Sequence, residues 1–157
     1  MNGIPRPLRR DRDASPRAPA HLRVRIPAAI HAELLNQSRA SLPQEGCGLL
    51  LGQRDDTTAT VSVAIPADNT RASSQAYEIA PEAVLAADRR ARADGLLLLG
   101  AWHSHPDGQA VPSPTDRAEA WPDWCYLIVG LADPGEPELR AWRLVGEDFI
   151  ADTLEIT

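Results

Sequence analysis

The sequence predicts a single α/β domain in which helices flank a mixed β-sheet. Three observations support this fold class. Apolar segments of strand length recur along the chain, and several of them alternate apolar with polar residues. Two segments between them have the helical spacing of apolar residues instead. The 157 residues are enough for one domain with a sizeable core.

The first twenty residues differ in composition from the rest of the chain. They hold four prolines and five arginines and almost no apolar pattern. Such a segment cannot bury enough surface to offset the entropy of ordering it. We therefore predict a disordered Arg/Pro-rich tail over residues 1–20 and a folded domain over residues 21–157.

The domain opens with a strand signal and a helix signal. Residues 22–26 alternate apolar side chains with arginines, which predicts an edge strand. Pro27 then opens a helix, because proline is tolerated at the first helical position. The apolar residues that predict the buried stripe of this helix are Ile30, Leu34 and Leu35.

A hairpin is the next expected unit. Residues 46–52 are a short apolar run and residues 58–65 alternate in period two, so we predict two strands joined at the Asp55-Asp56 turn. Tyr77 and Ile79 indicate a further short strand.

A second helix and four strands complete the predicted fold. The helix covers residues 81–93 and ends at Asp94-Gly95, with Val84, Leu85 and Ala91 facing inward. The first two of the four strands are apolar throughout, hence central, and the last two alternate and close the sheet: residues 96–102, 125–131, 139–145 and 149–156.

Residues 103–116, directly after the first central strand, are the most informative segment. His103 and His105 are one residue apart, so on an extended backbone both side chains project to the same face. Asp116 follows, and two imidazoles with one carboxylate leave the fourth position of a tetrahedral zinc open for water. Ser113, with proline after it, predicts the N-cap of a short helix. The segment therefore predicts a catalytic metal site.

A site of this kind also needs a general base. Glu45 lies among small residues and leucines just before an apolar strand, where an uncompensated carboxylate is unfavourable. Asp107 belongs to the turn dipeptide Asp107-Gly108 and is expected to serve the turn. Glu45 is therefore the candidate base, with a solvated surface charge as the alternative interpretation.

The chain resembles the JAMM/MPN+ metallopeptidase family. The family's motif is a glutamate on an early strand, then His-Ser/Thr-His, seven residues, a serine, two residues and an aspartate. Here these positions are Glu45, His103, Ser104, His105, Ser113 and Asp116. The resemblance covers about residues 21–157 and implies a cytidine-deaminase-like layering of sheet and helices.

The resemblance also implies a role for each motif residue. His103, His105 and Asp116 would hold one Zn²⁺ per chain. Glu45 would take a proton from the attacking water and pass it to the leaving amine. The Ser113 hydroxyl would donate to the oxyanion of the tetrahedral intermediate.

Two segments are similar to the small stand-alone bacterial branch of that family. One is Pro-Gln-Glu-Gly-Cys-Gly around Glu45, and the other contains Asn69 and Tyr77 ahead of the second helix. That branch hydrolyses the bond after the Gly-Gly terminus of ubiquitin-like sulfur carriers of the ThiS/MoaD type, releasing an amino acid or a short extension. Two alternatives stay open: a RadC-like protein, and a non-catalytic MPN-type scaffold that only binds partners.

Composition and charge bear on the other function classes. The net charge is −6, and seven of the sixteen basic residues lie in residues 1–25, so the acidic body argues against nucleic acid as a partner. Residues 95–102, the longest apolar stretch, are far too short to span a membrane. Cys47 and Cys125 make a poor disulfide framework and no signal peptide is visible, so we expect a cytoplasmic protein. A homodimer is left open.

Two further side chains near the motif have alternative interpretations. Trp102 directly precedes the predicted ligands and either lines a substrate slot or packs in the core. Ser104 alternates away from the two histidines and is expected to pack or to form a local hydrogen bond.

Overall fold

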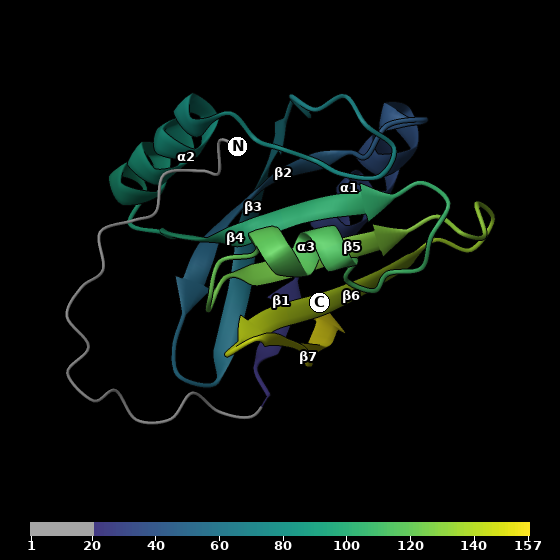
Figure 1. Ribbon diagram of the computed structural model, residues 1–157. Helices are drawn as coiled ribbons and strands as arrows, with labels where there is room; N and C mark the ends of the chain where they lie inside the picture. The colour runs from purple at the N-terminus through teal and green to yellow at the C-terminus, as the bar shows by residue number, and fades with distance from the viewer. Residues whose placement is uncertain (1–20) are drawn as a thin grey trace.

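The computed structural model describes residues 21–157, so the tail predicted over residues 1–20 lies outside the described residues and its boundary stays a prediction. The helices and strands, in chain order, confirm the α/β fold class (Figure 1): β1 (Arg23–Ile26), α1 (Ala28–Ser41), β2 (Cys47–Arg54), β3 (Thr58–Ala67), α2 (Pro81–Ala93), β4 (Leu97–His105), α3 (Pro114–Glu119), β5 (Cys125–Gly130), β6 (Glu138–Val145) and β7 (Asp148–Ile156).

The strands form a closed mixed barrel in the order β1-β3-β2-β4-β5-β6-β7. β1 is parallel to both β3 and β7, β4 is parallel to β5, and the remaining pairs are antiparallel. The edge strand predicted at residues 22–26 is therefore wrong, because β1 has a partner on each side. Alternation reports which face of a strand is buried, and it carries no information about the neighbouring strands.

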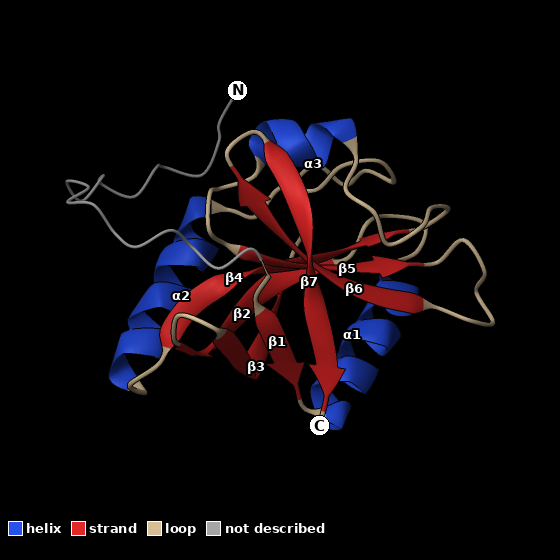
Figure 2. Cartoon of the chain, turned by 90° about the horizontal axis from the view of Figure 1, so that it is seen from below, coloured by secondary structure: helices blue, strands red, loops and turns tan. Residues whose placement is uncertain are grey.

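The two long helices pack on the outside of the strands, at different places around the barrel (Figure 2). α1 buries Ile30 and Leu34 in a core shared with Trp102 of β4, and Leu35 is partly buried. α2 buries Val84, Ala87 and Ala91 against a second core.

One inward residue predicted for α2 is wrong, because Leu85 is 52% exposed. Val84, Ala87 and Ala91 are spaced at i, i+3 and i+7 and share one helical face, which places Leu85 outside it. Pro27 is the N-cap of α1 and lies just before the first helical residue.

Residues 68–80, between β3 and α2, contain no strand, so the short strand predicted at Tyr77 and Ile79 is wrong. Ile79 is nevertheless buried, at 1% exposure. The backbone of this connection bonds to loop groups: the N–H of Thr70 donates to the carbonyl of Glu78, and the N–H of Glu45 donates to the carbonyl of Ser73. Ile79 is thus buried although its backbone does not pair with a neighbouring strand. This segment is named the 68–80 loop below.

None of the helices within residues 21–157 combines the length and the hydropathy that crossing a membrane would require.

Candidate metal centre

β4 carries both histidines on one face. His103 lies opposite Cys47 of β2 on one side and Ile128 of β5 on the other, so its backbone is fixed within the sheet. The His103 side chain is 1% exposed. The two imidazole centroids are 5.1 Å apart. The period-two geometry expected from the sequence is therefore realised by a central strand.

α3 holds Asp116 through a reciprocal cap. Ser113 is the N-cap residue, and its Oγ accepts the N–H of Asp116 at 3.0 Å. In return, the N–H of Ser113 donates to Oδ2 of Asp116 at 2.9 Å. Pro114 occupies the start of the helix, as the sequence indicated. This capping box fixes the Asp116 carboxylate at the helix terminus.

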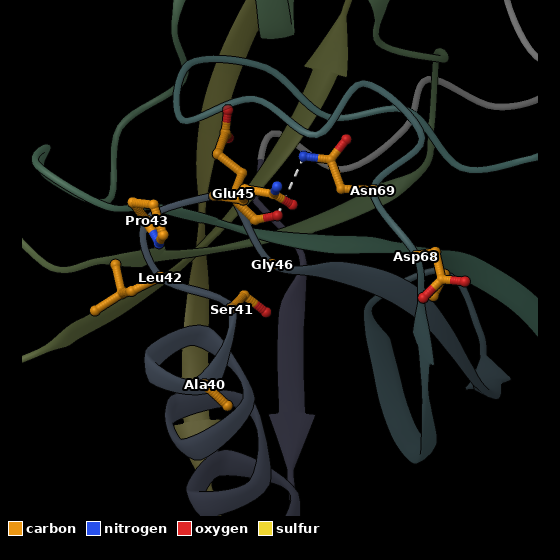
Figure 3. Close-up of a pocket in the computed structure, with 10 residues that line it drawn as sticks. Ala40, Ser41, Leu42, Pro43, Glu45, Gly46, Asp68 and Asn69 are labelled. Atoms are coloured by element: carbon orange, nitrogen blue, oxygen red, sulfur yellow. Dashed lines mark hydrogen bonds between the residues drawn. The ribbon is translucent and has the colours of Figure 1, made fainter.

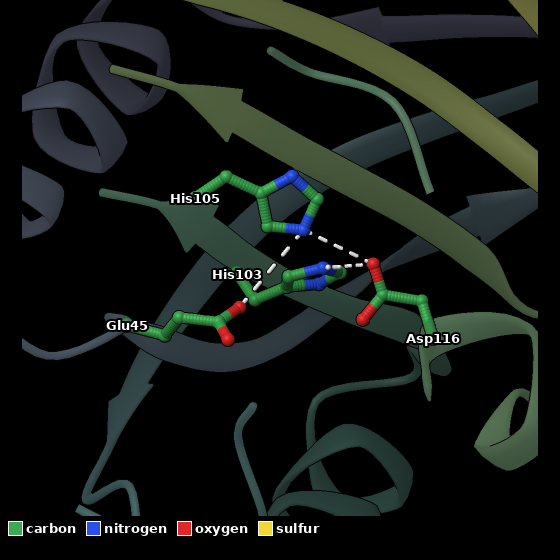
Figure 4. A group of neighbouring side chains, drawn as sticks. All are labelled: Glu45, His103, His105 and Asp116. Carbon is green, nitrogen blue, oxygen red and sulfur yellow. Dashed lines mark hydrogen bonds and ion pairs between the residues drawn. The ribbon is translucent and has the colours of Figure 1, made fainter. Parts of the chain in front are cut away.

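Four predicted site residues converge in space (Figure 4). Oδ2 of Asp116 lies 3.0 Å from Nε2 of His103 and 3.1 Å from Nε2 of His105. Oε1 of Glu45 lies 4.0 Å from the same nitrogen of His105. One ligand atom from each of the four side chains falls within 4.8 Å of the others. Ser113 adjoins this group through its cap with Asp116.

The donor set fits a divalent metal ion. Nδ1 of His105 lies 2.8 Å from the carbonyl oxygen of Gln109, which can only accept, so Nδ1 donates to it, and Nε2 is the nitrogen that can bind a cation once its own proton has left. Ligands about 2 Å from a tetrahedral zinc are roughly 3.3 Å apart, close to the separations seen between Asp116 and the histidines. Oε1 of Glu45 is buried and has no hydrogen-bond partner within residues 21–157.

Burial controls the electrostatics of the site. It raises the pKa of Glu45 to about 7, against the attraction of His105 and with the repulsion of Asp116. Burial acts in the same direction on Asp116, but hydrogen bonds from His103 and His105 outweigh it and lower the pKa of that carboxyl. At neutral pH the group therefore contains one firmly ionised carboxylate and one carboxyl that can gain or lose a proton.

Cys47 adjoins the site as a buried thiol. Burial, and the negative charges of Glu45 and Asp68, raise its pKa to about 12. Its Sγ lies 3.5 Å from the carbonyl of Ala67. A thiol with that pKa is protonated at neutral pH, so it is a poor nucleophile and a structural residue here.

The 68–80 loop brings two residues to the site that the sequence interpretation missed. The ring of Tyr77 stacks on His103, with centroids 4.5 Å apart and an interplanar angle of 21°. Arg71 hydrogen-bonds both carboxylate oxygens of Glu119 in α3, at 2.5 and 3.1 Å. The loop is thus tied across the site to the helix that carries Asp116. Spacing in the sequence gave no signal of either contact.

Two neighbours of the histidines lie elsewhere. Trp102 is 1% exposed and packs in the core shared with α1, so its interpretation as a slot residue is wrong. Asp107 is exposed and lies outside the converging group. Ser104 is fully buried, as the packing interpretation expected, and its hydroxyl accepts the N–H of Gly46, so its hydrogen bond joins distant segments and is not local.

A pocket of about 380 Å³ lies behind the backbone of Glu45 (Figure 3). It is lined by the α1–β2 connection and by the end of β3 with the residues after it, namely Ala40, Ser41, Leu42, Pro43, Gln44, Glu45, Gly46, Ala67, Asp68 and Asn69. The four converging side chains meet outside this pocket, since Glu45 is their only member among its lining residues.

Residues 27–145 match the model of a family described as prokaryotic homologs of the JAB domain. The chain belongs to this family. The resemblance to JAMM/MPN+ metallopeptidases, and to their small bacterial branch, is thereby confirmed.

Several relatives align over most of the domain. A desampylase of Haloferax volcanii is 37% identical over 109 residues, covering 68% of this chain and 74% of that protein. A probable TtuB-protein conjugate cleaving protease of Thermus thermophilus is 41% identical over 102 residues, covering 62% of this chain and 66% of that protein. A CysO-cysteine peptidase of Mycobacterium tuberculosis is 31% identical over 121 residues, covering 74% of this chain and 82% of that protein.

A solved structure supports the fold. The solution structure of a protein from Desulfitobacterium hafniense superposes with a TM-score of 0.79 at 30% identity, covering 85% of this chain and 92% of that one. With the relatives above, it identifies the chain as a JAMM-type hydrolase of mixed α/β architecture.

Proposed function

We propose that this protein is a zinc-dependent peptidase or isopeptidase that cleaves the bond after the C-terminal Gly-Gly of a ubiquitin-like sulfur-carrier protein. The observation that carries the proposal is the convergence of Oδ2 of Asp116 with Nε2 of His103 and His105, beside the buried carboxylate of Glu45. The two free cysteines favour the cytoplasm as its location.

The names of the relatives support this substrate class. One is named for cleaving TtuB-protein conjugates and another is named a CysO-cysteine peptidase. The first name describes a protein conjugate and the second an amino-acid adduct. We therefore propose a carrier protein as the common part of the substrate, with the leaving amine as the variable part.

His103, His105 and Asp116 would hold the metal ion through the three atoms that already face one another. When bound, Zn²⁺ supplies Lewis acidity and lowers the pKa of water to near 7. Nδ1 of His105 donates to the carbonyl of Gln109 and keeps the ring in the orientation that this role needs.

Glu45 performs the proton transfers. Its raised pKa, about 7, matches a group that takes a proton from the attacking water and returns it to the leaving amine near neutral pH. Because Oε1 has no hydrogen-bond partner among residues 21–157, the carboxylate is free to accept that proton.

Ser113 stabilises the developing oxyanion. Its Oγ accepts the N–H of Asp116, which leaves the hydroxyl proton available for donation to a substrate oxygen. An oriented donor of this kind contributes roughly 100- to 1,000-fold in rate.

The buried state of Glu45 also argues against the non-catalytic scaffold. A glutamate that is 2% exposed and whose Oε1 has no partner among the described residues 21–157 destabilises the fold, and a scaffold gains nothing from keeping it. A hydrolase needs a base in that position.

The test uses the full chain and a ThiS-type carrier that carries one extra cysteine after its Gly-Gly terminus. We expect about one zinc per chain by elemental analysis and release of cysteine by mass spectrometry. A second probe, the same carrier joined to a lysine side chain, separates peptidase from isopeptidase. Zinc at full occupancy without cleavage of either probe would overturn the proposal in favour of a scaffold.

A further inference from the structure

The backbone around the candidate base is held by two polar side chains that lie outside the converging group. The N–H of Gly46 donates to Oγ of Ser104 at 2.8 Å, and the N–H of Ser104 donates to the carbonyl of Gly46 at 3.0 Å. The strand pairing of β2 with β4 begins where Cys47 lies opposite His103. The two hydrogen bonds between Gly46 and Ser104 extend that pairing by one residue, toward Glu45. The Ser104 hydroxyl thus accepts the N–H that a backbone carbonyl would accept in a regular antiparallel strand pair.

A side chain at residue 46 would crowd Ser41. A Cβ built on residue 46 would lie 2.9 Å from Oγ of Ser41, which would have to shift, and 3.4 Å from Oγ of Ser104, an ordinary van der Waals separation. The hydroxyl of Ser104 contacts the peptide group that follows Glu45 directly.

Asn69 holds the same residue from the other side (Figure 3). Its Nδ2 donates to the carbonyl of Glu45 at 3.2 Å and to the carbonyl of Ala76 at 3.0 Å. Its Oδ1 accepts the N–H groups of Arg71 and Glu78, at 3.1 and 3.2 Å. One side chain therefore joins the 68–80 loop to the backbone of the base.

These contacts fix the backbone on both sides of the Glu45 Cα. Its N–H donates to Ser73, its carbonyl accepts from Asn69, and the next N–H donates to Ser104. At the far end of the side chain, Oε1 has no hydrogen-bond partner in the part of the chain that the structure describes. The direction of the carboxylate is therefore set largely from the backbone.

We infer that Ser104 and Asn69 are positioning residues that hold the backbone of Glu45 so that its carboxylate stays beside His105. The inference rests on the proposed function, in which Glu45 must reach the proton it transfers within about 3 Å. A displacement on the order of 1 Å can lower a rate about 100-fold. Neither side chain touches the reacting atoms, so both act through Glu45.

The test compares Ser104→Ala with a matched control, Ser38→Ala. Ser38 is also fully buried and its hydroxyl donates to the carbonyl of Leu34 within α1. We expect Ser104→Ala to lower kcat about 10- to 100-fold with KM and bound zinc unchanged, while Ser38→Ala leaves kcat unchanged. Ser104→Thr keeps the hydroxyl and should recover most of the loss.

A second readout needs no activity. In the metal-free protein, hydrogen exchange at the Gly46 amide should accelerate at least about 10-fold in Ser104→Ala and remain unchanged in Ser38→Ala. Asn69→Ala, at a half-buried position, is the second variant and should lower kcat in the same way.

Distinct outcomes separate the two proposals. Unchanged kcat and unchanged Gly46 exchange in Ser104→Ala would overturn the positioning role, and so would a kcat loss that merely follows loss of zinc. Wild-type protein that binds zinc but cleaves neither carrier probe would overturn the proposed function, and with it any role for these residues in a reaction.

Discussion

Oε1 of Glu45 lies 4.0 Å from Nε2 of His105, although Glu45 lies in the connection before β2 and His105 ends β4. The Glu45 carboxylate is 2% exposed, and burial raises its pKa to about 7. Next to it, Asp116 has a lowered pKa. Two carboxyl groups with opposite pKa shifts in one site indicate separate roles, a permanent ligand and a proton carrier.

Glu45→Gln should abolish turnover without releasing the metal. An amide of the same shape cannot accept the proton, so we expect kcat/KM to fall at least about 100-fold. His105→Ala removes a ligand and should lose both zinc and activity. Elemental analysis together with a cleavage assay distinguishes the two variants. Zinc loss from Glu45→Gln would contradict the assignment of Glu45 as a proton carrier that does not hold the metal.

The same substitution should stabilise the metal-free protein, in a pH-dependent way. The pKa of Glu45 is about 7 in the folded state against 4.5 for an ordinary glutamate. The folded state therefore holds the proton more tightly, and the free energy of unfolding falls as pH rises from about 4.5 to 7. Glutamine does not ionise, so Glu45→Gln removes this fall in the free energy of unfolding.

We expect Glu45→Gln to raise the free energy of unfolding by about 3 kcal/mol at pH 8 and by little at pH 4.5. Urea unfolding of both metal-free proteins at the two pH values measures this. An equal effect at both pH values would show that the raised pKa is not the cause.

Ser113→Ala should reduce both rate and stability. Loss of the oxyanion donor lowers kcat roughly 100- to 1,000-fold. Loss of the α3 N-cap, seen in the bond from Asp116, destabilises the fold by about 1 kcal/mol. Ser113→Thr keeps the hydroxyl and the cap, so it serves as the control in kinetic assays and thermal unfolding. Comparable kcat in Ser113→Ala and wild type would rule out the oxyanion role.

Tyr77→Ala should weaken metal binding. The Tyr77 ring packs flat against His103, and because loss of a hydrogen-bonding partner that orients a ligand costs about 10- to 100-fold in metal affinity, we expect loss of this stacking contact to fall at the lower end of that range. Tyr77→Phe keeps the ring and should remain within a few-fold of wild type. Competition with a zinc-binding dye gives both affinities. If Tyr77→Ala binds zinc as tightly as wild type does, the stacking contact has no part in holding the ligand.

Much of the fold followed from local pattern. The alternation of residues 58–65 and the apolar run at 96–102 correspond to β3 and β4, and the helix at 81–93 is α2. Ser113 is the cap that its position before proline indicated. Errors arose where a tertiary neighbour decides the outcome. β1 has two partners, Leu85 faces outward, and residues near Tyr77 bury side chains without forming a strand.

The amino-acid order alone determined which side chains are candidates at the site. Two histidines at a period of two share one face of any strand, and a serine before proline starts a helix that contains Asp116. Tertiary structure decided what surrounds them: that Glu45 is buried with a raised pKa, that Tyr77 covers His103, and that Ser104 and Asn69 hold the base. The reason is physical. Local periodicity fixes directions along one element, whereas desolvation and contact distance exist only once separate elements have packed together.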